Sequence, residues 1–560
     1  MTLVKQRWIP QCLFAASLAW GGLVQAEVKM PSVFGDHMVL QQDAALPVWG
    51  SADAGEKVTV TVGAESASAT ADASGRWSVK LKALPTGSTP VTMTVEGKNK
   101  LTFSDVLVGE VWFCSGQSNM AFALGSTDQA TADMAKAIDP QMRYFHVEGS
   151  PGLDPSSSFA CGKWQLCTPE VASALSGVAY FFGRELRGTL NRPVGLMISA
   201  WGGTAIESWT PLSAIEGDPY FKYDTDHHAQ MVADYPKLLA DFPAKQKEWH
   251  DAMVEWNKNG GDAYNAALKA WTDSAAAARA AGQPEPAGKP TPPATPAPKQ
   301  PPAPNGGTGS FGSLYNGVVA PVVSYAIRGA IWYQGESNAA NPGKYAKMFP
   351  AMIKGWRTAW DEGDFAFLFV QLPKFAPGAH WPEMREVQSK ALALPATAMA
   401  SIIDIGDPKN IHPAHKSDVG KRLALAALHA AYGKDLVWSG PVYDSMKVEG
   451  NAIRLNFKQT GGGLIIGTAP WTAPDVTPLP NTMLAGFAIA GDDKKWVSAD
   501  AKIDGNTVLV SSDKVPQPFA VRYAWQNSPD CNLYNKEMLP AAPFRTDDWS
   551  PLGETPAPAK

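Results

Sequence analysis

The segment Val106–Met120 reads VLVGEVWFCSGQSNM, an apolar run that ends in a serine-bearing turn. A short, continuous apolar run bounded by turn residues is typical of a buried β-strand. Similar runs are expected to form strands at residues 194–199, 326–333, 365–372 and 399–405. Helical periodicity is present at residues 171–186, 345–360 and 416–432. Apolar strands that alternate with helices predict an α/β domain built on a doubly wound parallel sheet.

The sequence on either side of this α/β segment has a different pattern. Residues 27–104 contain short alternating runs such as Val58–Val62, separated by turn residues, which predicts an N-terminal β-sandwich. Short strands return later and predict a C-terminal β-domain at residues 436–546, followed by a tail at 547–560. The α/β domain itself is expected in two parts, residues 105–212 and 312–435. Between them, residues 213–311 read as a helical insertion with a proline-rich linker.

Residues 1–26 have the pattern of a secretory signal peptide, with basic residues, a short apolar run and small residues at Val24–Ala26. No later run approaches about 18 uninterrupted apolar residues, so no membrane span is expected. The protein is therefore expected to be secreted or periplasmic. A net charge of −5 also lacks the basic excess that nucleic acid binding requires. In an oxidising compartment Cys161 and Cys167, which flank a short loop, are candidates for a disulfide.

Three short strings that follow predicted strands supply the parts of an acyl-transfer site. They are Gly116–Met120, Gly335–Asn338 and His412–Pro413, which provide a serine, a side-chain amide and an imidazole. Acyl transfer from an ester requires an oxygen nucleophile, a base and donors for the developing oxyanion. Each string alone is more often a helix cap or a turn. Because the carboxyl ends of parallel strands meet at one edge of the sheet, the three are expected to converge there.

The blocks Phe113–Met120, Trp201–Trp209, Trp332–Ala339 and Asp407–Pro413 resemble those of sialate O-acetylesterase-like carbohydrate esterases, which belong to the SGNH hydrolase superfamily. The resemblance implies a flavodoxin-like sheet and a serine esterase that removes O-acetyl groups from a glycan through an acetyl-enzyme. No metal and no cofactor are expected. The resemblance leaves the glycan open: O-acetylated sialic acids, or acetylated plant polysaccharides such as xylan or xyloglucan. The alternative is an inactive carbohydrate-binding protein on an esterase fold.

The same resemblance implies roles for individual residues. Ser118 would attack the acetyl carbonyl and His412 would act as general base. The oxyanion donors would be the backbone amides of Ser118 and of Gly202 or Gly203, together with the side chain of Asn338.

Three further polar residues lie inside the same blocks. Gln117, Gln334 and Glu207 are candidates for contacts with sugar hydroxyls. Hydrogen bonds to neighbouring loop amides are an equally good interpretation of these side chains.

The sequence does not determine the acid of a catalytic triad. The superfamily often places aspartate three residues before the histidine, and Lys409 occupies that position here. Asp407 is the nearest carboxylate and would reach the imidazole if the chain bends after it, although it would equally begin a turn. Asp404 or Glu336 would be substitutes, and a serine–histidine dyad is the remaining option.

Overall fold

The computed structural model describes residues 27–155, 161–280, 283–284, 286–469, 477–480 and 482–549 of the 560-residue chain. The predicted signal peptide lies outside the described residues. The chain divides into two compact units, of which the smaller is the segment His227–Gly307 and the larger comprises the rest of the described chain. In the described ranges, no helix combines the length and apolarity needed to cross a membrane.

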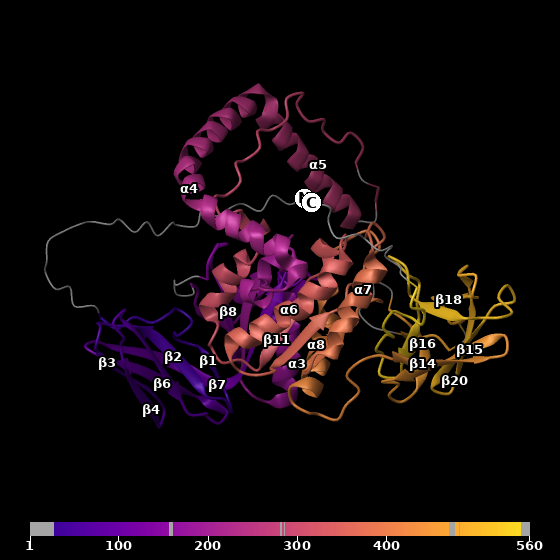
Figure 1. Ribbon diagram of the computed structural model, residues 1–560, viewed down its shortest axis with the longest axis horizontal. Coiled ribbons are helices and arrows are strands. Elements are labelled where there is room, and N and C mark those ends of the chain that lie inside the picture. The colour runs from indigo at the N-terminus through magenta and orange to yellow at the C-terminus, as the bar shows by residue number, and fades with distance from the viewer. Residues whose placement is uncertain are drawn as a thin grey trace. The chain divides into compact units, whose positions relative to one another are not determined.

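A mixed sheet organises the larger unit (Figure 1). Its α/β part has the strand order β13-β12-β11-β7-β10-β8-β9, and each neighbouring pair from β13 to β8 is parallel. The edge strand β9 runs antiparallel to β8. The bounds are β7 Lys100–Gly116, β8 Asp139–His146, β9 Trp164–Cys167, β10 Val194–Ala200, β11 Gly329–Tyr333, β12 Ala366–Val370 and β13 Thr397–Ala400. The predicted parallel sheet is thus present, with β8 and β9 as strands that the sequence pattern did not reveal.

Helices cover both faces of this sheet. Along β7, Val111 and Phe113 enter one hydrophobic core, whereas Trp112 and Cys114 enter the other, because successive strand residues point to opposite faces. The first core is completed by α6 (Pro342–Trp360) and α7 (Trp381–Lys390), and the second by α3 (Gly177–Leu190) and α8 (Lys416–Ala430). The doubly wound arrangement expected from the sequence is therefore observed.

Two predicted elements differ from the structure. The helix expected at residues 171–186 is two helices, α2 (Pro169–Ala174) and α3, because the Ser176 hydroxyl accepts the Ala179 amide at 3.0 Å and caps α3. The strand expected at residues 399–405 ends at Ala400. Beyond it the chain leaves the sheet, and both carboxylate oxygens of Asp404 accept hydrogen bonds from Arg422, at 2.6 and 2.7 Å.

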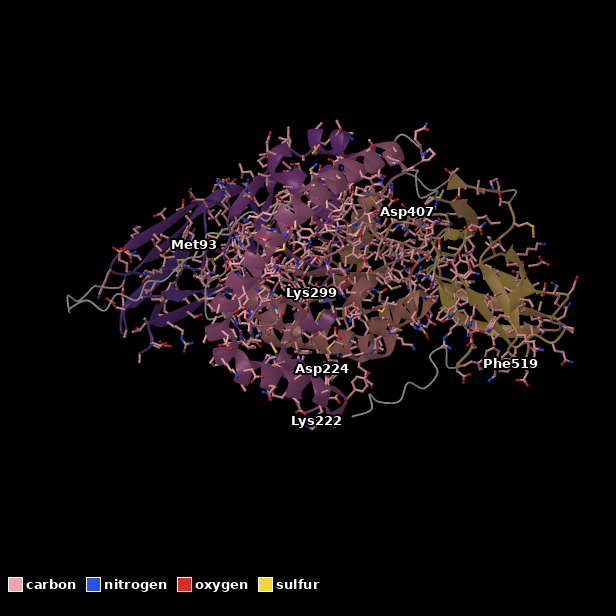
Figure 2. All side chains as sticks on the ribbon, turned by 90° about the horizontal axis from the view of Figure 1, so that it is seen from above. Met93, Lys222, Asp224, Lys299, Asp407 and Phe519 are labelled. Carbon is pink, nitrogen blue, oxygen red and sulfur yellow. The ribbon has the colours of Figure 1, made fainter. Side chains whose placement is uncertain are left out.

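Short strands flank the α/β part on both sides in the sequence. Strand β7 is long enough to serve two sheets, since its first half pairs antiparallel with β6 and its second half lies between β10 and β11. The N-terminal strands are β1 Val39–Gln41, β2 Leu46–Ser51, β3 Lys57–Val62, β4 Glu65–Thr70, β5 Arg76–Leu81 and β6 Gly87–Glu96. The C-terminal strands are β14 Val442–Glu449, β15 Ala452–Lys458, β16 Leu464–Thr468, β17 Thr477–Pro478, β18 Phe487–Ala490, β19 Val497–Ser498, β20 Asp500–Asp504, β21 Thr507–Ser511, β22 Ala520–Tyr523, β23 Leu533–Asn535 and β24 Phe544–Arg545. Side chains of both regions, including Met93 of β6 and the exposed Phe519, are labelled in Figure 2.

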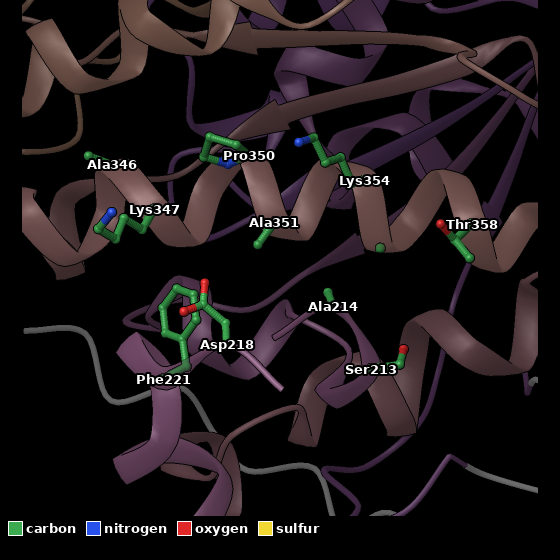
Figure 3. Close-up of a pocket in the computed structure, with 11 residues that line it drawn as sticks. Ser213, Ala214, Asp218, Phe221, Ala346, Lys347, Pro350, Ala351, Lys354 and Thr358 are labelled. Carbon is green, nitrogen blue, oxygen red and sulfur yellow. The ribbon is translucent and has the colours of Figure 1, made fainter. Parts of the chain in front are cut away.

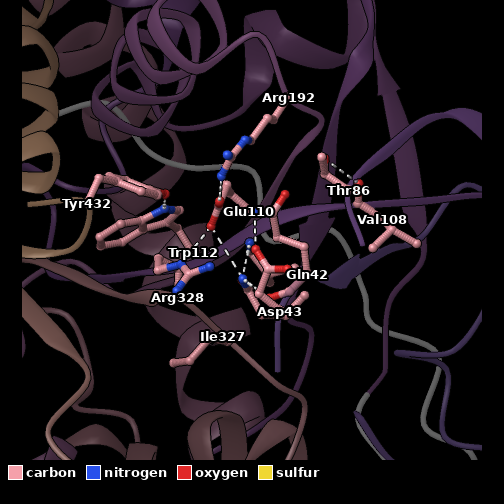
Figure 4. Close-up of polar contacts among 12 residues, drawn as sticks. Gln42, Asp43, Thr86, Val108, Glu110, Trp112, Arg192, Ile327, Arg328 and Tyr432 are labelled. Carbon is pink, nitrogen blue, oxygen red and sulfur yellow. Dashed lines mark hydrogen bonds and ion pairs between the residues drawn. The ribbon is translucent and has the colours of Figure 1, made fainter. Parts of the chain in front are cut away.

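A buried carboxylate ties the N-terminal strands to the α/β sheet (Figure 4). Glu110 of β7 has no exposed surface and accepts hydrogen bonds from Arg328 at 2.7 Å, Arg192 at 3.2 Å and Gln41 at 3.3 Å. Gln41 belongs to β1, whereas the two arginines precede β11 and β10. A buried charge is tolerated only when it is paired and hydrogen-bonded. Glu110 therefore holds three separate segments together.

The smaller unit contains most of one long helix, the whole of a second helix, and the proline-rich tract. Helix α4 (Lys222–Trp256) and helix α5 (Asp262–Ala280) are joined by a kink at Gly260, whose φ of 107° suits glycine. Indole N–H groups of Trp249 and Trp256 donate to carbonyls of the proline-rich tract at 3.1 and 2.8 Å. Proline carbonyls remain acceptors although the ring nitrogen has no hydrogen, so the tract is held by tryptophans from the helices.

The disulfide considered for Cys161 and Cys167 is not formed. Cys161 and Cys167 are not joined by a disulfide, and neither are Cys114 and Cys531. Cys167 is buried and its sulfur lies 3.6 Å from the hydroxyl of Tyr144, whereas Cys161 is exposed. The fold therefore places the two thiols in different environments.

Candidate active site

The fold brings Ser118 and His412 together across 294 sequence positions, with a hydrogen bond of 2.7 Å between Ser118 Oγ and His412 Nε2. Ser118 follows the carboxyl end of β7, and His412 lies in the loop between β13 and α8. Both side chains are half-buried. A hydroxyl within hydrogen-bond reach of an imidazole is the geometry of an activated nucleophile.

Glycine is required where the chain leaves β7 and turns toward Ser118. Gly116 has a φ of 143°, and a Cβ at this position would overlap the carbonyl oxygen of Tyr333 on the neighbouring strand β11. The same carbonyl accepts the backbone amide of Gln117 at 3.0 Å. The close approach of the two strands therefore sets the turn that presents the serine.

The backbone of the second block passes beside Ser118. A Cβ on Gly202 would lie 3.3 Å from the Cβ of Ser118, and the amide of Trp201 donates to the carbonyl of Gly116 at 3.1 Å. Gly203 has a φ of 73°, in the left-handed region of backbone conformation that favours glycine. The predicted glycine donors are thus placed on the turn next to Ser118.

Asn338 connects the second and third blocks. Its Nδ2 donates to Glu207 at 2.8 Å, while its Oδ1 accepts from Gln334 at 2.7 Å and from the Ile206 amide at 2.9 Å. An amide nitrogen carries two hydrogens, so one donor remains after the bond to Glu207. Glu207 is also paired with Lys344, at 3.2 Å. Hydrogen bonds to residues of the second block and of its own third block therefore fix the orientation of the Asn338 side chain.

The side chains proposed for sugar contacts are engaged in the protein. Gln334 has no exposed surface, and besides Asn338 its amide donates to the carbonyl of Thr204 at 3.2 Å. Gln117 is buried and accepts the backbone amide of Ser337 at 3.4 Å. These contacts match the alternative interpretation, in which the side chains satisfy loop amides. Glu207 retains some exposure, 19% of its side chain.

The structure gives no support to a hydrogen bond between Asp407 and His412. Asp407, which is labelled in Figure 2, lies five residues before His412, and its carboxylate accepts the backbone amide of Lys409 at 2.8 Å. This is the turn geometry that aspartate commonly adopts before proline. In the described part of the chain, His412 has no carboxylate as a hydrogen-bond partner. Of the substitutes, Asp404 is bound to Arg422, and Glu336 accepts from Asn119 at 2.6 Å.

The environment of His412 favours a neutral imidazole. Burial lowers its pKa, and the positive charge of Lys416 lowers the pKa further. A histidine that stays neutral can accept the proton of the serine hydroxyl over a wider pH range.

Sequence reasoning missed two charged residues beside this pair. His415 is buried between Asp128 and Asp418, at 2.6 and 2.9 Å, and Lys416 is buried at the start of α8. Histidine and lysine at the start of a helix ordinarily read as exposed charges, and no local pattern distinguishes these two. Asp418 is only three residues from His415, but Asp128, and Asn119 as the partner of Lys416, come from distant segments that only the fold brings close.

A separate groove of about 560 Å³ runs along α6 (Figure 3). Neither Ser118 nor His412 lines it. Its lining residues are Ser213, Ala214, Asp218, Phe221, Ala346, Lys347, Pro350, Ala351, Lys354, Gly355 and Thr358.

Known proteins resemble this chain in sequence and in structure. A family described as "Carbohydrate esterase, sialic acid-specific acetylesterase" matches residues 305–429. The crystal structure of a carbohydrate acetylesterase from Xanthomonas citri is 33% identical, with a TM-score of 0.72, over 93% of this chain and 100% of that chain. Sialate O-acetylesterases from Rattus norvegicus and Homo sapiens are 27% and 25% identical over 92% of this chain, and 94% and 92% of their own.

The similarity to the Xanthomonas citri structure extends over the N-terminal, α/β and C-terminal regions, so it concerns the whole molecule rather than one motif. The protein is an esterase that acts on carbohydrates. The chain belongs to the family of sialic acid-specific acetylesterase-like carbohydrate esterases.

Proposed function

We propose that this protein is an exported serine esterase that removes O-acetyl groups from carbohydrates through an acetyl-enzyme intermediate. The hydrogen bond of 2.7 Å between Ser118 and His412 is the observation that carries the proposal. We further propose that residues 105–212 and 312–435 form an SGNH-type catalytic domain, and that residues 1–26 are a signal peptide.

In the proposed first step, His412 Nε2 takes the proton of Ser118 as Oγ attacks the acetyl carbonyl. Negative charge develops on the carbonyl oxygen. The backbone amides of Ser118 and of Gly202 or Gly203, with the remaining donor of Asn338, would stabilise it. His412 then delivers the proton to the sugar oxygen, and the deacetylated sugar leaves.

In the second step, water attacks the acetyl group on Ser118 and His412 again accepts a proton. Acetate leaves and the hydroxyl is restored. We propose that the serine–histidine dyad performs this cycle without a third residue, because the carboxylate of Asp407 is bound to the amide of Lys409. No cofactor enters either step.

The proposed substrates are glycans with O-acetyl groups. The rat and human relatives are named for O-acetylated sialic acid, and the Xanthomonas citri relative is named a carbohydrate acetylesterase. O-acetylated sialic acids are candidates on the basis of these names, and acetylated plant polysaccharides, xylan or xyloglucan, are the candidates that the resemblance of the sequence motifs leaves open.

Acetate release from a panel of acetylated sialoglycans, xylan and xyloglucan tests the reaction and the substrate together. Ser118→Ala should reduce release by about four orders of magnitude, because the nucleophile is lost. Ser337→Ala, at an exposed serine of the third block, is the matched control and should retain activity. If Ser118→Ala releases acetate at the wild-type rate, the proposed nucleophile is wrong.

A further inference from the structure

One buried amide joins the segments that carry the proposed catalytic pair. Asn119 follows Ser118 directly and has no exposed surface. Its Oδ1 accepts a hydrogen bond from Lys416 Nζ at 2.5 Å. Its Nδ2 donates to Glu336 Oε1 at 2.6 Å and to the carbonyl oxygen of Ile411 at 2.9 Å. Asn119 therefore contacts α8, the short helix η9 (Glu336–Asn338), and the residue immediately before His412.

The charges at the two ends of this bridge are shielded from water. Lys416 has no exposed surface, and its ammonium group lies 4.9 Å from the ring centre of Phe122 and 5.2 Å from that of Tyr333. The Oε2 atom of Glu336 is buried and has no hydrogen-bond partner in the described chain. Charges so placed are costly for folding, and they occur most often where function requires them.

We propose that Lys416 is a positioning residue for the esterase reaction. It acts through Asn119 to hold Ser118 and His412 in place, and its positive charge acts on the imidazole. This inference rests on the proposed roles of Ser118 and His412. The positioning part follows from the hydrogen bonds, because Asn119 is covalently next to the nucleophile and binds the carbonyl next to the base. A lost contact that shifts reacting groups by about 1 Å is enough to lower turnover about a hundredfold.

The electrostatic part has a definite sign. Burial lowers the pKa of Lys416 to about 7, an effect that Glu336 opposes, so Lys416 carries its charge below that pH. This charge lowers the pKa of His412 beyond the effect of burial. Removal of Lys416 should therefore raise the pKa of His412. The acid limb of the pH–activity profile, where activity is lost as His412 becomes protonated, should then move to higher pH.

Other titratable groups around the bridge are Glu336 on η9, Tyr333 on β11, and His415, which precedes Lys416. Burial raises the pKa of both Glu336 and Tyr333. His415 is held between two carboxylates, and its pKa is about 9. Tyr333 and His415 therefore titrate well above the acid limb, and Glu336 is the group whose own titration must be separated from that of His412.

The experiment compares Lys416→Met, Lys416→Arg and Asn119→Ser in the full-length protein, with an aryl acetate as substrate. Lys416→Met should lower kcat about a hundredfold with little change in KM, and should shift the acid limb upward. Lys416→Arg, which keeps a charge and a donor, should recover the position of the acid limb. Asn119→Ser should lower kcat and leave the acid limb in place, because the Lys416 charge remains.

Lys421→Met is the matched control, since Lys421 lies on the same helix with 44% of its side chain exposed. It should behave as wild type. Circular dichroism identifies any variant that does not fold. If Lys416→Met is unfolded, Asn119→Ser and Lys416→Arg decide the outcome.

Two results separate the failure of this inference from the failure of the proposed function. Suppose first that Ser118→Ala is inactive. The role of Lys416 is then overturned by a wild-type kcat in Asn119→Ser, or by a folded Lys416→Met whose activity falls at the same acidic pH as that of the wild type. Retained activity of Ser118→Ala on the same aryl acetate overturns the proposed function itself.

Discussion

His412 and His415 are three residues apart, yet the fold places them in opposite electrostatic environments. His412 bonds to a serine hydroxyl, faces the charge of Lys416, and has a lowered pKa. Burial alone would also lower the pKa of His415, but hydrogen bonds to Asp128 and Asp418 outweigh it and raise the pKa to about 9. One imidazole is thus kept neutral, as a base must be, and the other is kept as a cation that ties two segments together.

Among changes at the two histidines and at Asp407, replacing the neutral His412 should have the largest effect. His412→Gln removes the base and should lower turnover about a thousandfold, because general base catalysis typically contributes that much. The melting temperature should change little, since Ser118 is the partner of the His412 ring. Initial rates of acetate release and a thermal melt measure the two effects. A loss of only a few-fold would remove His412 from the proposed mechanism.

His415, the charged histidine of the two, should contribute to stability in a pH-dependent way. The folded pKa of His415, about 9, lies above the ordinary value of 6.5. Its contribution to the free energy of unfolding is therefore fully present below about pH 6.5 and is lost as the pH rises through 9. His415→Gln should lose up to about 3 kcal/mol of stability at pH 6 and far less at pH 9.5.

Chemical denaturation at the two pH values measures this difference. His380→Gln is the control, because half of the His380 side chain is exposed and its nearest carboxylate oxygen, on Glu383, is 3.9 Å away. A stability loss in His415→Gln that is equal at both pH values would show that His415 is not held as a cation.

The smallest effect is expected at Asp407, and it decides whether the neutral histidine works without a carboxylate. Asparagine retains an oxygen that can accept the Lys409 amide, so Asp407→Asn should preserve the turn and keep turnover within about twofold. Steady-state kinetics on the best glycan of the panel test this. A loss of a hundredfold or more, with an intact fold, would establish Asp407 as the acid of a triad and refute the dyad.

Local patterns in the sequence were sufficient for much of the fold. Continuous apolar runs identified β7, β10, β11 and β12, because buried parallel strands must be apolar on both faces. Strand β8 was missed because the charged Arg143 interrupts its apolar residues, and this arginine is buried by pairing with Asp105 at 3.0 Å. A partner distant in sequence allowed a charge inside the strand, which no local pattern indicates.

In the candidate site, too, some residues could be predicted from local sequence and others could not. The sequence predicted Ser118 and His412 from the residue types that acyl transfer requires, and the fold brings these two side chains to hydrogen-bond distance, whereas Gly202 or Gly203 came from the family resemblance alone. Lys416 and His415 were not found, because lysine and histidine at a helix start carry no local sign of burial. The assignment of Asp407 also depended on a side-chain direction that a loop sequence leaves undetermined.

The sequence by itself determined the alternation of strands and helices, the turn that carries Ser118, and the class of chemistry that its motifs permit. Only the tertiary structure decided which groups surround each ionisable side chain. The physical reason is that secondary structure follows from neighbours along the chain, whereas electrostatic interactions depend on distance in space. Lys416 and Asn119 are 297 positions apart in the chain and 2.5 Å apart in the fold.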